Sequence, residues 1–374
     1  MTFLERHNVR RVMNALGTST IVGANVATPV AREAAAEALT INCEIDDLQR
    51  AASCAISRAT GAEAGCVTSS ASSGIAIAAA ACMTGADLAK VAQLPNTEGL
   101  ANEVVLQQAH DVNFGAPISQ MVRLSGARVV TIGTANHCDG FHLRGALSPR
   151  TAAVLYVVNG AISSAADLIP LEECVAIAGD VPVIVDAAAE PDVRLFLRAG
   201  ASIVISSGHK AMGALTSGLI CGRKALIRAC YLQNWGIGRA MKVGKEGIAG
   251  LIAAIERWYG PGRGDEAAHH SEVTAALAAK LEVQPASSPH RVRIQVARDA
   301  RQIANLLREG DPPIWVNEAS GRSLTLDIRN LTPADAAQIA DRILFAANSS
   351  DLPREDVAYH DLYWSEARLM RWPD

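Results

Sequence analysis

Short runs of β-branched and other apolar residues alternate with segments of helix length through the middle of the chain. The expected strands are 127–132, 152–158, 181–186, 201–206 and 218–221, and the expected helices are 171–178, 192–198 and 223–233. Strands that are apolar almost throughout, with helices between them, are typical of a mainly parallel sheet covered on both faces. The sequence therefore predicts an α/β fold.

A break in this pattern divides the chain into domains. The chain has 374 residues, more than a single core usually holds. The segment Gly260-Pro261-Gly262-Arg263-Gly264 is the clearest interruption, and short strands and helices follow it from 291 to 346. We expect a large domain over residues 46–260 and a small C-terminal α+β domain over 265–374. We expect residues 1–45 to pack with the small domain.

Composition excludes several classes of protein. The formal net charge of -4 provides no broad basic field, so nucleic acid is not expected as a partner. The chain has no apolar run long enough for a membrane span and no signal-peptide core at its start, which favours a cytoplasmic protein. The eight cysteines form no Cys-x-x-Cys pair and no Cys/His ligand spacing, so we expect free thiols and no metal.

An acid and a lysine follow two successive strands of the expected sheet. The apolar run 183–185 ends in Asp186, and Lys210 follows the next strand in the turn Ser207-Gly208-His209-Lys210. Functional groups in open α/β sheets lie at the carboxyl ends of strands. Taken singly, Asp186 could be a helix cap or a structural ion pair, and Lys210 a surface lysine. Together they bring a carboxylate and an amine to one site.

Pyridoxal 5'-phosphate (PLP) requires such a pair. The amine forms a Schiff base, and the carboxylate keeps the pyridine nitrogen protonated. The phosphate needs an anion cradle, and the serine-rich segment 67–74 leads into an Ala-rich helical stretch. Hydroxyls and free N–H groups at a helix start suit a phosphate, although this segment alone could be a simple helix cap.

Several segments resemble one family. They are Asn14-Ala15-Leu16-Gly17-Thr18, Thr60-Gly61-Ala62-Glu63-Ala64, residues 182–190, Ser207–Lys210 with Ser217-Gly218-Leu219, and residues 238–246 with Gly250-Leu251. The chain resembles, over residues 8 to 260, the SelA-like group of PLP enzymes, and within it the branch of D-glucosaminate-6-phosphate ammonia-lyases. The resemblance implies fold type I, the fold of aspartate aminotransferase. It also implies a homodimer or higher homo-oligomer with shared active sites.

The resemblance also implies roles for individual residues. Lys210 would carry PLP and move the Cα proton, Asp186 would pair with the pyridine nitrogen, and His110 would stack on the ring, with Phe114 as the alternative. The remaining cofactor-binding residues would be Ser69, Ser70, Ala71, Ala188, Ser207, His209 and Arg239. Arg239 could reach a phosphate from a neighbouring subunit, or it could belong with Lys242 to a solvated basic loop.

The reaction expected from this branch is β-elimination from a small amino acid or amino sugar acid, giving a 2-oxo acid and ammonia. Arg239, Lys242, Arg322 and Arg329 are the candidate substrate-binding residues, although Arg322 and Arg329 could simply close the ends of strand 323–328. Racemisation, aldol cleavage and transamination need the same core residues and stay open.

Other functions are disfavoured on specific grounds. Selenium transfer onto seryl-tRNA would need an RNA-binding segment, and we expect none before residue 8. A cysteine desulfurase needs a late cysteine, and the last one is Cys230, while Ala189 stands where that class tends to have Gln. Ala211-Met212-Gly213-Ala214 lacks the Arg and Pro of close SelA-like relatives, so substrate recognition could differ. A PLP-fold binding protein without activity is the non-enzymatic alternative.

Overall fold

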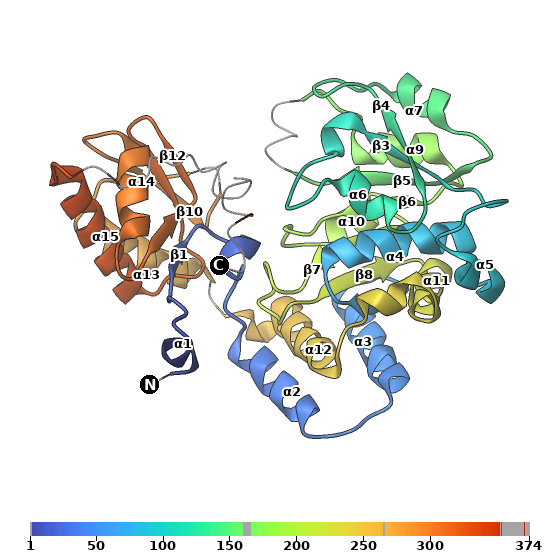
Figure 1. The fold of residues 1–374 in the computed structure, drawn as a ribbon, viewed down its shortest axis with the longest axis horizontal. Coiled ribbons are helices and arrows are strands. Elements are labelled where there is room, and N and C mark those ends of the chain that lie inside the picture. Colours follow the sequence, from blue (N-terminus) through green and yellow to red (C-terminus); the bar gives the residue numbers. More distant parts are fainter. Residues whose placement is uncertain are drawn as a thin grey trace. The chain divides into compact units, whose positions relative to one another are not determined.

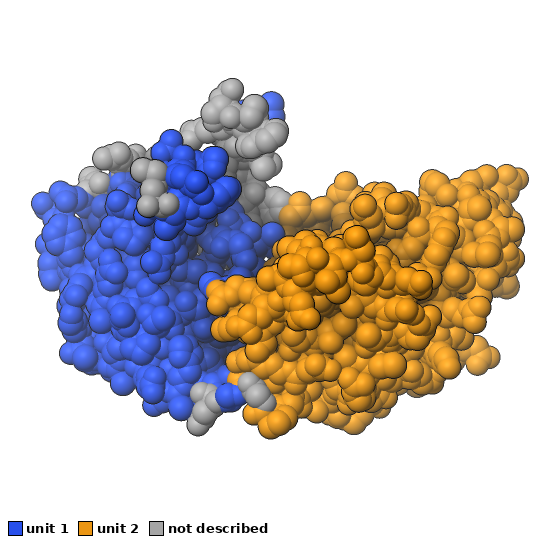
Figure 2. Space-filling model, turned by 90° about the horizontal axis from the view of Figure 1, so that it is seen from below, with its two compact units in different colours: residues 1–26, 264–374 blue, residues 27–263 orange. Residues whose placement is uncertain are grey.

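The computed structural model describes residues 2–159, 166–264, 266–286, 288–351, 353 and 370. Two compact units make up the chain, one of residues 27–263 and one of residues 1–26 with 264–374 (Figure 2). We call them the large and the small unit. Among the described helices none is long and apolar enough to cross a lipid bilayer.

The large unit is built on a seven-stranded sheet of order β2-β8-β7-β6-β5-β3-β4. Six strands run in one direction, and β8 is antiparallel to both neighbours, so the expected mainly parallel sheet is confirmed. The strands are β2 (Ala64–Thr68), β3 (Glu103–Gln107), β4 (Arg128–Ile132), β5 (Thr151–Val157), β6 (Val183–Asp186), β7 (Ile203–Ser207) and β8 (Gly218–Gly222).

Helices cover both faces of this sheet (Figure 1). Side chains alternate across the strands, so Val183 and Val185 join one apolar cluster and Ile184 the other. The helices are α2 (Pro29–Leu39), α3 (Ile45–Thr60), α4 (Ala71–Thr84), α5 (Leu88–Gln93), η2 (Gln108–His110), α6 (Ile118–Arg123), α7 (Gly140–Ala146), α9 (Leu171–Ala178), α10 (Arg194–Arg198), α11 (Lys224–Leu232), η3 (Gln233–Trp235), η4 (Ile237–Met241), α12 (Lys245–Tyr259) and η5 (Pro261–Arg263).

Helix α4 lies deepest in the large unit. Almost all of its residues are buried, and most of them are alanine, glycine or serine. Small side chains allow a helix to approach a sheet closely, and a Cβ on Gly74 would lie only 2.9 Å from Cγ2 of Ile205 on β7. The start of α4 is thereby fixed next to the middle of the sheet.

The small unit packs a four-stranded antiparallel sheet, order β12-β13-β10-β9, against helices. A second pair of strands, β1 and β11, runs parallel and joins residues 13–15 to 314–316. The elements are α1 (Phe3–Arg6), β1 (Met13–Ala15), η1 (Thr20–Val22), α13 (Glu266–Ala278), β9 (Val283–Pro285), β10 (Arg291–Gln295), α14 (Ala300–Glu309), β11 (Ile314–Val316), β12 (Glu318–Ser320), β13 (Ser323–Asp327) and α15 (Pro333–Asn348).

The N-terminal segment is divided differently from our expectation that residues 1–45 pack with the small domain. Residues 1–26 group with the small unit, and 27–45 with the large one. The cause is the contact between α2 and α12: Ala31 of α2 is buried, and a Cβ on Gly250 of α12 would lie 3.2 Å from the Ala31 carbonyl oxygen.

Candidate active site

Asp186 and Lys210 lie at the carboxyl ends of two adjacent parallel strands. Asp186 is the last residue of β6, and Lys210 follows β7 by three residues. The strands stay paired beyond their ends, because the Ala187 N–H donates to the Ile205 carbonyl at 2.9 Å and the Ser207 N–H to the Ala188 carbonyl at 3.2 Å. The arrangement expected from the sequence is therefore present.

The electrostatics of the two residues are coupled. Burial raises the pKa of Asp186 from 3.8 to about 6, although the positive charge of Lys210 and the Ala188 N–H, which donates to Oδ1 at 3.2 Å, act to lower it. Burial also lowers the pKa of Lys210, and the charge of Asp186 partly offsets this effect. Burial thus shifts both groups toward their neutral forms, as is common at functional sites.

The loop that carries Lys210 is held by close packing. The Gly208 N–H donates to the Ser217 carbonyl, and the Ala214 N–H to the Gly208 carbonyl, both at 2.9 Å. A Cβ on Gly208 would lie 2.4 Å from Oγ of Ser217, so glycine is required there. His209 contacts Oγ of Ser207 through Nδ1 at 3.1 Å, and burial lowers its pKa.

A serine cluster forms the start of α4. Ser70 is the N-cap, and its Oγ accepts the Ser73 N–H at 3.0 Å. Oγ of Ser69 also contacts Oγ of Ser73, at 3.1 Å. A Cβ on Gly218 would lie 2.2 Å from the Ser70 carbonyl oxygen, and Gly218 pairs with Ser207 across β7 and β8. The serine cluster and the lysine loop therefore lie close together.

His110 lies on the other side of Asp186. The Val157 N–H donates to Nδ1 of His110 at 3.3 Å, and Val157 is the cross-strand partner of Asp186. Burial lowers the pKa of His110 to about 4, so the ring is neutral, with its proton on Nε2. The ring packs edge-on against Tyr156, with 4.6 Å between the centroids. Tyr156 was missed by the sequence analysis, because only the strand pairing reveals this contact.

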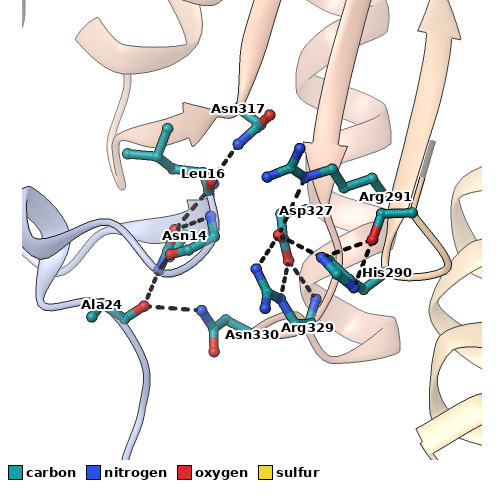
Figure 3. A network of polar contacts seen from close by, with 11 residues as sticks. Asn14, Leu16, Ala24, His290, Arg291, Asn317, Asp327, Arg329 and Asn330 are labelled. Carbon is teal, nitrogen blue, oxygen red and sulfur yellow. Dashed lines mark hydrogen bonds and ion pairs between the residues drawn. The ribbon is translucent and has the colours of Figure 1, made fainter. Parts of the chain in front are cut away.

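The remaining predicted residues lie in two places. Arg239 in η4 and Lys242 after it are exposed on the large unit, as is Phe114. Arg322 is exposed on the small unit, between β12 and β13. Arg329 follows β13 and binds Asp327 through Nε and Nη2, at 3.0 and 2.6 Å. Arg329 therefore closes the end of strand β13 at least in part (Figure 3), which was the alternative to a role in substrate binding.

The sequences of several known proteins align with most of this chain. D-glucosaminate-6-phosphate ammonia lyase of Salmonella typhimurium is 38% identical, over 90% of this chain and 95% of that protein. The 5'-C-glycyluridine monooxygenase-decarboxylase of a Streptomyces species is 36% identical, over 89% and 88%. The L-seryl-tRNA(Sec) selenium transferase of Nitratidesulfovibrio vulgaris is 26% identical, over 82% and 67%.

Solved structures show the same relationship. The structure of D-glucosaminate-6-phosphate ammonia-lyase aligns with a TM-score of 0.85 at 35% identity, over 94% of this chain and 100% of that one. Sphingomonas wittichii serine palmitoyltransferase aligns with a TM-score of 0.55 at 16% identity, over 90% and 87%, which supports the fold alone. The model of the family SelA, described as L-seryl-tRNA selenium transferase, matches residues 12–304. The chain therefore belongs to the SelA family and has the type I fold of PLP-dependent enzymes.

Proposed function

We propose that this chain is a PLP-dependent lyase of the ammonia-lyase type. Its substrate is an amino acid or amino sugar acid with a hydroxyl on Cβ, and its products are a 2-oxo acid and ammonia. The observation that carries the proposal is the pair formed by the buried Asp186 at the end of β6 and the half-buried Lys210 just after β7. The similarity to an ammonia lyase over 90% of the chain supports the reaction type.

The residues of the site fit the three parts of PLP. A half-buried amine and a buried carboxylate lie together, and the serine cluster opens a helix whose first N–H groups suit a phosphate. Lys210 would hold the cofactor through Nζ, Asp186 would hold its pyridine nitrogen, and His110 would lie against the ring. The phosphate would lie at Ser69, Ser70, Ala71 and Ser207, and Ala188 and His209 would line the site.

Bound PLP would supply the sink for the electrons left on Cα when its proton departs. Lys210 would take that proton as general base, and its lowered pKa favours the neutral amine that this step needs. Asp186 would keep a proton on the pyridine nitrogen, because an ionised carboxylate in a buried site strongly favours a cation beside it. The β-hydroxyl would then leave as water by taking up the proton removed from Cα, and the released enamine would hydrolyse with one water molecule to the 2-oxo acid and ammonia.

Substrate recognition would depend on cations outside this core. Arg239, Lys242, Arg322 and Arg329 are the candidates for the carboxylate or a phosphate of the substrate. Two named relatives act on amino acids built on a sugar skeleton, which favours a polyhydroxylated substrate here. We further propose a homodimer or higher homo-oligomer in the cytoplasm, to be tested by light scattering of the purified protein.

A second candidate reaction comes from the Streptomyces relative. At 36% identity over 89% of the chain, it is almost as similar as the lyase, and its name describes a monooxygenase and decarboxylase. Removal of the proton from Cα, which leaves a pair of electrons on that carbon, can start either reaction. An enzyme of this second kind would consume O₂ and release CO₂, whereas a lyase works without O₂ and releases ammonia.

The experiment is turnover of a panel of 3-hydroxy amino acids and amino sugar acids by PLP-loaded protein without O₂. We expect ammonia and 2-oxo acid in equal amounts, no activity from Lys210→Ala, and weak PLP retention with most turnover lost in Asp186→Ala. Lys224→Ala, an exposed lysine of the same unit, is the control and should stay active. Turnover that requires O₂ and yields CO₂ would establish the second reaction instead. An undiminished Lys210→Ala enzyme would defeat both.

A further inference from the structure

The ring of His110 is held by a hydrogen bond at one of its nitrogens. The Val157 N–H donates to Nδ1 at 3.3 Å, and the histidine is buried, with 2% of its surface exposed. One hydrogen bond fixes the position of Nδ1 but restrains rotation about the Cβ–Cγ bond only loosely, because this torsion has broad minima. The plane of the imidazole therefore needs a second contact.

Tyr156, the residue before Val157 on β5, supplies that contact. Its ring packs against His110 with 4.6 Å between the centroids and 72° between the planes, which is an edge-to-face arrangement. Pairs of this geometry are favoured by the charge distribution of the rings and add to the energy of burial. Tyr156 and Val157 thus fix His110 from one strand, and Val157 is also the cross-strand partner of Asp186.

Tyr156 is itself fixed on the sheet. It lies opposite Val185 of β6 and is half-buried against the apolar cluster that contains Val185 and Cys174. Burial, with smaller contributions from the acidic neighbours Cys174 and Glu172, raises the pKa of its hydroxyl to about 12. The tyrosine therefore stays uncharged at neutral pH, as does His110, and the contact joins two neutral rings.

The backbone of η2, which carries the imidazole, has anchors of its own. Gln107, the last residue of β3, is buried; its Oε1 accepts the Ile169 N–H at 3.0 Å, and its Nε2 donates to the Ile169 carbonyl at 3.3 Å. Just after η2, Oδ1 of Asp111 accepts the Ser119 N–H at 2.7 Å. Loss of the aromatic contact should therefore free the plane of the imidazole and leave η2 in place.

We propose that Tyr156 is a positioning residue that sets the plane of the His110 ring, and through it the orientation of the cofactor ring in the site. The inference rests on the proposed function, because it takes PLP as the ring that His110 would lie against. A flat ring held at a fixed angle restricts the tilt of a second flat ring that packs on it. Because the contact is made by the aromatic ring of Tyr156, phenylalanine should replace tyrosine and an aliphatic residue should not.

The test compares wild type, Tyr156→Leu and Tyr156→Phe by circular dichroism in the visible absorbance band of bound PLP. This signal depends on the orientation in which the protein holds the cofactor. Tyr156→Leu should bind PLP about two- to tenfold more weakly, as expected for the loss of one edge-to-face pair, and should give a smaller dichroic signal per bound cofactor. Tyr156→Phe should match wild type in both measurements.

Tyr231→Leu is the matched control. Tyr231 of α11 forms an edge-to-face pair with Trp235, with 5.5 Å between the centroids and 77° between the planes. Helix α11 follows β8, whose last residue, Gly222, pairs with Ile203 at the start of β7, so α11 begins at the edge of the sheet opposite to the site. This variant should lose stability in thermal melts but keep the PLP affinity and the dichroic signal of wild type.

Crystal structures of the cofactor-free proteins make the outcome independent of the proposed reaction. Tyr156→Leu should show the His110 ring turned from its plane in wild type, or in two orientations, with η2 unmoved. Tyr156→Met replaces the Leu variant if that does not fold. An unchanged His110 plane or full dichroism in Tyr156→Leu would overturn the proposal, and so would a Tyr156→Phe protein as impaired as Tyr156→Leu. Wild type that binds no PLP would refute the proposed function, and the cofactor-free structures would still decide whether Tyr156 sets the plane of His110.

Discussion

Replacing Asp186 with asparagine should stabilise the cofactor-free protein while it abolishes turnover. Asp186 is buried, and its pKa in the folded protein is about 6 instead of 3.8. A carboxyl whose pKa is raised on folding destabilises the folded state whenever it is ionised. Asparagine keeps the shape of the side chain without the charge. Under the proposed function, the carboxylate would be a functional group that the folded protein retains at the expense of stability.

The size of this effect follows from the pKa change. A rise from 3.8 to about 6 corresponds to about 3 kcal/mol, at about 1.4 kcal/mol for each pH unit. Below pH 3.8 the carboxyl is protonated in both states and the substitution changes little. The gain in the free energy of unfolding grows as the pH rises and is complete above about pH 6. At pH 5 it should therefore be roughly half of its value at pH 8. Loss of the favourable contact with Lys210 reduces this upper limit.

The assay is urea unfolding of the PLP-free wild type and Asp186→Asn at pH 5 and pH 8. Asp192→Asn is the control, and its effect on the free energy of unfolding should have the opposite sign. A hydrogen bond donated by Arg194 lowers the pKa of Asp192, so losing the Asp192 carboxylate should destabilise the protein slightly. The reasoning would be refuted if Asp186→Asn were less stable than wild type at pH 8. It would also be refuted if the substitution raised the free energy of unfolding by the same amount at both pH values.

Four further substitutions, at three positions, test other parts of the site. Ser70→Ala removes the acceptor of the Ser73 N–H and should cost about 1 kcal/mol of stability as well as PLP affinity. Ser70→Asp keeps the cap but repels a phosphate, so near-normal melting with at least tenfold weaker PLP binding, about 1.4 kcal/mol, would separate the two roles. Gly218→Ala places a methyl group 2.2 Å from the Ser70 carbonyl oxygen, and we expect about 1–3 kcal/mol of destabilisation in thermal melts and weaker PLP binding. His110→Phe should leave the pH profile of kcat unchanged between pH 6 and 9, because the pKa of His110 is only about 4; a displaced acidic limb would show that His110 titrates during turnover.

The central sheet and the acid–lysine pair could be predicted from the sequence because both are local patterns. The strand expected at 201–206 is β7, Ile203–Ser207, and the helix expected at 171–178 is α9, with the same bounds. Apolar runs fix where strands lie, and carboxyl ends of neighbouring parallel strands meet at one edge. Asp186 and Lys210 follow from these two rules without any knowledge of side-chain contacts.

Features that depend on distant parts of the chain could not be predicted. Arg291 faces Asp327 only through the register of an antiparallel ladder, and Gly17 reaches the same carboxylate from the other end of the chain. The boundary after residue 26 depends on the packing of the Ala-rich α2 against α12, which leaves no mark in either segment alone. In each case the physical cause is a long-range contact whose partners carry ordinary local patterns.

The most direct test of the account is whether Lys210 carries PLP. Purified protein should show a visible absorbance band that borohydride bleaches, and peptide mapping by mass spectrometry after reduction should place the cofactor on Lys210. That result would establish the cofactor chemistry on which the lyase proposal depends. A colourless protein that PLP cannot reconstitute, or a reduced cofactor on another lysine, would contradict the account.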